Sequence, residues 1–295
     1  MKFHPPNEEE ARQAIGSLDG LPERFRKAFL PSRDFEPVPA PGPNDWLAVH
    51  PEPGHAFADF VRSRPNKPDA IRNTVYLQPL EDFETGKAPP LQTLAQFAQA
   101  FFRVPVQTLS PSTVSRRKIT TRTNPYTGQP QLLTRDVLRH LQQILPKNAF
   151  CIVGITMRDL YPAPSWNFVF GEASLDDRVG VFSFARYDPQ FYGIQAPDRE
   201  GLVLRRSCKV LAHETSHMFG IQHCVFFNCL MNGSNHLDES DRRPLHLCPI
   251  DLRKLHHSTG FDIDHRYRVL LEFAHTVGFK DEIRWLERRL EIHAS

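Results

Sequence analysis

The sequence predicts a mixed α/β protein, and two observations carry this fold class. From about residue 70, strand-like segments alternate with segments that have helical periodicity, which is the pattern of strands joined by helices. Hydrophobic residues make up 40% of the 295 positions, enough to form a sizeable core. The 36 basic and 34 acidic residues are interspersed, so we expect neither a nucleic-acid nor a membrane partner.

Proline marks the first part of the chain as different from the rest. Of the 26 prolines, 12 lie in the first 68 residues, and we expect residues 35–54 to sustain neither a helix nor a central strand. We therefore predict a proline-rich N-terminal extension over residues 1–66 and a catalytic domain over residues 67–295. Short helices are expected in the extension after Asn7 and around residues 22–30, lying on the main domain.

The first elements after the extension form a βαβ unit. It comprises a strand at 73–80, a helix at 91–103 and a second strand at 104–110. Another helix follows Thr134, and it leads into residues 149–161, which are apolar enough for a strand in the centre of a sheet.

The second half of the chain predicts an edge hairpin and then helices. Residues 167–172 and 179–186 flank a turn-rich segment, so we expect them to pair as antiparallel strands at one edge. After a histidine-rich stretch, three segments have the patterns of helices that close the chain: 248–260, 265–278 and 280–294.

Cysteine content and the absence of apolar runs bear on the compartment. An odd number of cysteines argues for thiols or metal ligands rather than a disulfide framework; they lie at 151, 208, 224, 229 and 248. The start shows no secretory signal pattern, and no run of about 18 apolar residues could span a bilayer. We therefore expect a cytoplasmic or nuclear protein, with Cys151 and Cys208 as buried structural residues.

The histidine-rich stretch at 210–233 has the spacing of a catalytic zinc site. In a helix, His213 and His217 project from one face, and Glu214 stands beside them, where it can accept a proton from a metal-bound water. Gly220 can end the helix in the left-handed conformation, which would let His223 approach the ion from another side. Three imidazoles leave one tetrahedral position open for water.

The probability that these five positions match by chance is below about 2 in 10,000. Together they form the metzincin signature, which continues to a methionine turn. Met231 is the candidate for that turn. The run from His213 to Met231, with Cys224 directly after the third histidine and Cys229 two residues before the methionine, resembles the archaemetzincins, a cytosolic branch of the metzincin zinc peptidases. The resemblance extends over about residues 70–260.

The resemblance implies a metzincin-like fold, with a five-stranded mixed sheet over an active-site helix. It also implies small peptides as substrates, with aminopeptidase character as one option, and a second zinc held by cysteines. This chain departs from the family pattern, which ends in Cys-x-x-Cys, because Asp251 stands where the cysteine after Cys248 is expected. A second zinc would then need Asp251 or His246 as its fourth ligand, and an empty site with three reduced thiols is the remaining alternative.

We therefore predict a zinc metallopeptidase in which Glu214 is the general base and no covalent intermediate forms. Substrate is expected to lie extended against the strand at 167–172. One alternative is a non-catalytic, zinc-stabilised protein whose extension binds a partner, and another is a redox protein that uses Cys224 and Cys229. An intact Glu214 and an open fourth position favour the enzyme. The sequence leaves the natural substrate and the oligomeric state open.

Overall fold

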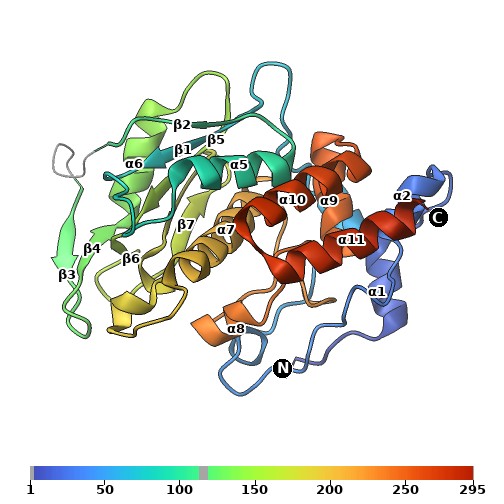
Figure 1. The fold of residues 1–295 in the computed structure, drawn as a ribbon, viewed down its shortest axis with the longest axis horizontal. Helices are drawn as coiled ribbons and strands as arrows, with labels where there is room; N and C mark the ends of the chain where they lie inside the picture. Colours follow the sequence, from blue (N-terminus) through green and yellow to red (C-terminus); the bar gives the residue numbers. More distant parts are fainter. Residues whose placement is uncertain (1–2, 113–118, 295) are drawn as a thin grey trace. The chain divides into compact units, whose positions relative to one another are not determined.

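The computed structural model describes residues 3–112 and 119–294 (Figure 1), and the chain forms two compact units. Residues Lys67–Met218 form the first, here called the sheet unit. The second, here called the helical unit, combines Met1–Asn66 with Phe219–Ser295. The N-terminal proline-rich segment therefore packs with the C-terminal helices. The predicted assignment of residues 1–66 to an extension and of residues 67–295 to a catalytic domain stays a prediction.

A five-stranded mixed sheet is the centre of the sheet unit, as the predicted fold class requires. Its strand order is β2-β1-β5-β8-β7. The first four strands are parallel, and β7 is antiparallel to β8 at the edge. The strands are β1 (Thr74–Pro79), β2 (Val106–Thr108), β5 (Ala149–Thr156), β7 (Gly171–Ser174) and β8 (Val179–Ser183). Every residue of β1, β5 and β8 is buried, which explains their continuous apolar runs.

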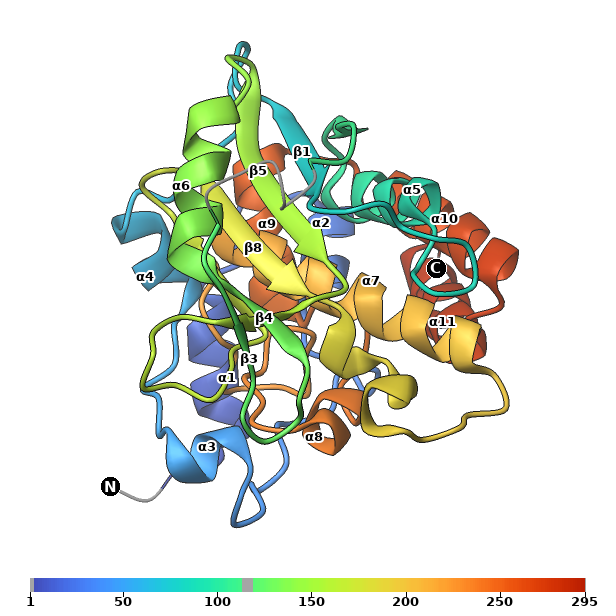
Figure 2. The ribbon, with the colours of Figure 1, turned by 90° about the vertical axis from the view of Figure 1, so that its left-hand side faces the viewer.

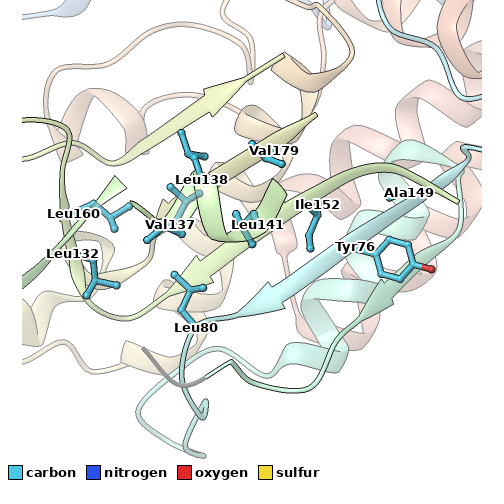
Figure 3. Close-up of a cluster of buried hydrophobic side chains, with 11 residues drawn as sticks. Tyr76, Leu80, Leu132, Val137, Leu138, Leu141, Ala149, Ile152, Leu160 and Val179 are labelled. Carbon is cyan, nitrogen blue, oxygen red and sulfur yellow. The ribbon is translucent and has the colours of Figure 1, made fainter. Parts of the chain in front are cut away.

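Helices cover both faces of this sheet (Figure 2). The helix α5 (Leu91–Phe102) connects β1 to the parallel β2, which confirms the βαβ unit, and it packs on α7 (Arg199–Met218). On the other face, α6 (Thr134–Ile144) lies against β5 and β8. A cluster of buried side chains from α6 and the strands fills this interface (Figure 3). Two glycines of neighbouring strands face opposite sides of the sheet. A Cβ atom at Gly154 would meet Leu141 of α6, whereas a Cβ atom at Gly180 would approach Met218 of α7.

A second, three-stranded sheet was not predicted. It contains β3 (Thr121–Thr123), β4 (Pro130–Leu133) and β6 (Asp159–Tyr161) in the order β3-β4-β6. The single strand predicted at 149–161 is therefore wrong in its second half, because the chain turns after β5 and enters this other sheet. Glu81 stabilises the turn by accepting hydrogen bonds from the Thr156 hydroxyl and the Met157 amide.

The antiparallel edge pair is confirmed, but both strands are shorter than predicted. The strand β7 begins at Gly171 rather than at residue 167, because Val169 makes an isolated bridge with Leu160 instead. The strand β8 ends at Ser183, and a 3₁₀ helix follows at Ala185–Tyr187.

The helical unit contains the predicted short N-terminal helices and the predicted C-terminal ones. Its helices are α1 (Glu8–Ile15), α2 (Glu23–Phe29), α3 (Trp46–Val49), α4 (Phe57–Arg62), α8 (Leu237–Asp241), α9 (Pro249–Thr259), α10 (Ile263–Val277) and α11 (Lys280–Ala294). Asn7 caps α1 in a capping box with Glu10, as expected for a polar residue before an acidic first turn. The prediction that residues 35–54 contain no helix is wrong by one turn, since α3 forms in the proline-free stretch between Pro43 and Pro51. Within the described residues, no helix has the length and apolar character needed to cross a membrane.

Candidate metal centres

The helix α7 places the first two predicted zinc ligands together. The Nε2 atoms of His213 and His217 are 3.2 Å apart, and their rings are perpendicular. Two nitrogens on one tetrahedral zinc, each about 2.05 Å from the metal, are separated by about 3.3 Å. The spacing of the two side chains therefore fits a shared ion. Glu214 follows His213 on the same helix and is partly buried.

The chain leaves α7 through a left-handed glycine. Gly220 has a φ of +79°, which confirms the conformation predicted for this position. A Cβ atom here would also lie only 3.0 Å from the Cβ atom of Pro65, so both the backbone angle and the close packing require glycine.

The third predicted ligand, His223, belongs to the helical unit. Its Nδ1 atom lies 2.9 Å from Oε1 of Glu52, and the edge of its ring meets the Trp46 indole with 5.1 Å between ring centroids. Sequence reasoning missed both partners, because no local pattern connects His223 to residues as distant in the chain as Glu52, which lies 171 positions earlier. His213 and His217 lie in the sheet unit, so the joining of all three histidines around one ion stays a prediction.

The helical unit brings three cysteines and Asp251 together. The Cys224 and Cys248 sulfurs are 3.7 Å apart, and Oδ2 of Asp251 lies 3.4 Å from the sulfurs of Cys229 and Cys248. On a tetrahedral zinc, two sulfurs would be about 3.8 Å apart, and a sulfur and a carboxylate oxygen about 3.5 Å. The four donor atoms lie within 4.8 Å of one another, and all four residues are buried. Their spacing thus fits one zinc ion.

His246, the other candidate for a fourth ligand, has a different environment. Its ring stacks on the indole of Trp285, with the centroids 3.8 Å apart and the planes nearly parallel. It also meets the edge of Phe35. Asp251, rather than His246, is therefore the residue beside the sulfurs. Its position follows from α9, because Cys248 is the N-cap of that helix and Asp251 lies in the first turn.

A loop closed by hydrogen bonds holds two of the cysteines. The Cys224 amide donates to the Met231 carbonyl, and Met231 is completely buried. The side chain of Asn232 accepts from the Cys229 amide and donates to the carbonyls of Cys224 and Phe227, each at 2.8 Å. The sequence analysis did not predict a role for Asn232. Its position directly after Met231, the methionine of the predicted turn, is the signal that could have indicated one. This residue fixes the two thiols relative to each other.

Burial and mutual hydrogen bonds shift the pKa values of the three thiols in different directions. Burial alone would raise the pKa of Cys224, but hydrogen bonds from Cys229, Cys248 and two backbone amides outweigh it and lower that pKa. Burial and the neighbouring Cys224 raise the pKa values of Cys229 and Cys248. Zinc binds cysteine as the thiolate, so a zinc ion at this site would displace any protons that the three thiols carry.

Lys254 lies against the cluster of three cysteines and Asp251, and the sequence analysis did not predict this. Its Nζ atom is 2.8 Å from Oδ1 of Asp251, and both side chains are almost completely inaccessible to solvent. Burial raises the pKa of Asp251 to about 6, although the ammonium of Lys254 acts in the opposite direction. The lysine therefore supplies a positive charge next to a group of acidic ligands.

The remaining cysteines fit the structural role predicted for them. Cys151 lies in β5 and Cys208 in α7, and both are buried. Burial raises the pKa of Cys151, which makes its thiol a poor nucleophile. None of the five cysteines, all of which lie in the described part of the chain, forms a disulfide.

Comparison with known proteins decides the family. The model of peptidase family M54 matches residues 131–257. Archaemetzincin-2 of Macaca fascicularis is 41% identical over 286 residues, which cover 87% of this chain and 79% of the relative. The chain belongs to the archaemetzincin family. Archaemetzincin-2 of Homo sapiens is 39% identical, and the match covers 84% of this chain and 77% of the relative. Archaemetzincin-1 of Mus musculus is 34% identical, and the match covers 88% of this chain and 60% of the relative.

Two solved archaemetzincin structures also match. The one from Archaeoglobus fulgidus, complexed with malonate, is 29% identical, with a TM-score of 0.44 over 61% of this chain and 99% of that one. The one from Methanopyrus kandleri is 28% identical, with a TM-score of 0.48 over 65% of this chain and 97% of its own.

Membership of the archaemetzincins makes this protein a zinc metallopeptidase, which confirms the predicted enzyme class. Zinc is its metal, and peptides are its class of substrate. The donor atoms described above fit this metal, since imidazole, thiolate and carboxylate are the ligands that zinc takes in proteins.

Proposed function

We propose that this archaemetzincin hydrolyses peptide bonds at a catalytic zinc held by His213, His217 and His223, with Glu214 as the general base. The observation that carries the proposal is the 3.2 Å separation of the His213 and His217 Nε2 atoms on α7. His223 follows His217 by six residues, and the left-handed Gly220 lies between them. Chain length alone therefore keeps His223 within about 20 Å of the pair.

A zinc ion held by these three histidines would supply a bound water of lowered pKa and would polarise the scissile carbonyl. The carboxylate of Glu214 then accepts a proton from the attacking water as the carbon–oxygen bond forms. It delivers that proton to the leaving nitrogen as the carbon–nitrogen bond breaks. The products are a carboxylic acid and an amine, and no protein side chain becomes acylated. Burial of Cys151 and Cys208 fits this direct route.

Substrate binding is proposed at β7, the antiparallel edge of the five-stranded sheet. Within the described residues, β7 pairs with β8 only, so its other side can form main-chain hydrogen bonds with an extended peptide. Small peptides are the proposed substrates, with aminopeptidase character as a further part of the proposal, and both follow from the resemblance stated above.

The proposal includes a second, structural zinc bound by Cys224, Cys229, Cys248 and Asp251. Its support is the set of sulfur–sulfur and sulfur–oxygen distances that match a closed tetrahedral site. A closed site of four protein ligands has no position for substrate, so this ion would stabilise the loop around Met231 rather than take part in hydrolysis.

The experiment that tests the function is a peptide-library digest read by mass spectrometry. We expect the purified protein to cleave short peptides, to lose this activity after treatment with a chelator and to recover it when zinc is added. The terminus at which new fragments appear would decide the aminopeptidase question. A protein that holds zinc and cleaves no peptide in the library would contradict the proposal.

A further inference from the structure

A segment of the proline-rich N-terminal region packs closely on the loop that carries His223. A Cβ atom at Gly54 would lie 2.7 Å from Val225 and 2.9 Å from Phe226. A Cβ atom at Gly233 would lie 2.4 Å from the Trp46 ring. Because real Cβ atoms do not approach other atoms so closely, these two contacts both require glycine. The packing of residues 45–54 on residues 223–233 is thus a built feature of the helical unit.

Polar contacts anchor the beginning of this segment. The Trp46 amide donates to Oε1 of Glu239 at 2.8 Å, and the other oxygen of Glu239 accepts from the Asn235 amide. Asp45 pairs with His236 at 2.9 Å and with Arg242 at 3.0 Å. The indole of Trp46 is therefore held from its backbone as well as by its packing on Gly233.

Trp46 in turn fixes the carboxylate of Glu52. The indole Nε1–H donates to Oε1 of Glu52 at 2.8 Å, and the same oxygen lies 2.9 Å from Nδ1 of His223. About a quarter of the Glu52 side chain and a fifth of the His223 side chain are exposed, so the contact is partly shielded from water. One carboxylate oxygen thus connects the indole and the imidazole.

We propose that Glu52 is a positioning residue for the metal ligand His223, and this inference rests on the function proposed above. A neutral imidazole carries one N–H and one acceptor nitrogen. Because a carboxylate can only accept, a hydrogen bond to Glu52 places the proton on Nδ1, so that Nε2 carries the lone pair that can bind zinc. A carboxylate behind a metal-bound histidine also fixes the ring orientation and raises the basicity of the ligand. The N-terminal region therefore completes the metal site.

The first test measures zinc affinity of the full-length protein by competition with a chromogenic chelator. We expect Glu52→Ala to weaken the catalytic zinc by about 10- to 100-fold. Glu52→Gln should recover most of this loss, because an amide oxygen also accepts from both N–H groups. Glu36→Ala is the matched control, since Glu36 contacts Asn228 in the same loop without touching His223, and its zinc affinity should equal that of the parent.

The second test reads the imidazole proton directly. In ¹⁵N NMR spectra of the metal-free chain, His223 should carry its proton on Nδ1, and Glu52→Ala should give a mixture of tautomers, an effect that loss of packing alone would not produce. His223→Ala separates the two proposals. If His223→Ala leaves zinc affinity unchanged, the three-histidine site is wrong. If it weakens zinc while Glu52→Ala changes neither the affinity nor the tautomer, only the role of Glu52 is wrong.

Discussion

Replacement of Asp251 by asparagine should be strongly destabilising, because it breaks a buried ion pair in α9. Asp251 is inaccessible to solvent, Lys254 is 1% exposed, and their charged atoms are 2.8 Å apart. The side chain keeps its size in Asp251→Asn, so no cavity forms. What changes is that the ammonium of Lys254 loses its carboxylate at a site that is almost completely inaccessible to solvent.

The expected loss is about 3 to 5 kcal/mol, the usual cost of leaving one charge of a buried pair without its partner. This is a large fraction of the roughly 5 to 15 kcal/mol that a typical domain has in total. Asp281→Asn is a suitable control. Asp281 pairs with Arg284 at the same three-residue helical spacing, but both side chains are about two-thirds exposed. A change below about 1 kcal/mol is expected there.

The assay is urea unfolding of the metal-free protein at pH 8, followed by fluorescence, for the parent and both variants. The midpoint of Asp251→Asn should fall far more than that of Asp281→Asn. If the two variants unfold at the same urea concentration, Lys254 is not held as a buried charge and the electrostatic description of the cysteine cluster is wrong.

Three further predictions concern the metals and the acid response. Asp251→Cys should bind the second zinc more tightly, because zinc prefers a fourth sulfur once three are present, and metal analysis during chelation would show no difference if that site does not exist. Met231→Leu should keep zinc and activity, since the buried methionine packs and leucine conserves its volume; loss of metal would mean that its role is different. Burial and, to a lesser extent, Lys254 lower the pKa of His55 to about 4, so between pH 6.5 and 4 the unfolded chain binds a proton that the folded chain does not. The free energy of unfolding should therefore decrease as the solution is acidified through this range, by up to about 1.4 kcal/mol per pH unit. His55→Leu should reduce this slope in urea titrations at several pH values, and an unchanged slope would exclude His55 as its source.

Local patterns explain which parts of the fold the sequence predicts. The helix α6 and the strands β1 and β5 follow from their apolar patterns, because their side chains contribute to one buried cluster. The strand β3 could not be predicted from an apolar pattern, since its three residues, Thr121–Thr123, are polar and largely exposed. The end of β5 could not be predicted either, because the turn after it depends on Glu81, which lies 75 positions before Thr156 in the chain.

The same distinction holds for the metal centres. Helical spacing predicts the pairing of His213 with His217, because both lie on one face of α7. The choice between Asp251 and His246 needs the three-dimensional packing that places the histidine on Trp285. The contact between Glu52 and His223 also comes from tertiary structure alone, since it connects two distant parts of the chain.

The measurement that tests the central claim most directly is peptide hydrolysis by Glu214→Ala, with zinc content determined on the same sample. Because Glu214 is proposed to transfer a proton and not to bind the metal, the variant should hold as much zinc as the parent. Its turnover should fall by about 100-fold or more, the usual contribution of a general base. Turnover equal to that of the parent, at equal zinc content, would contradict the mechanism.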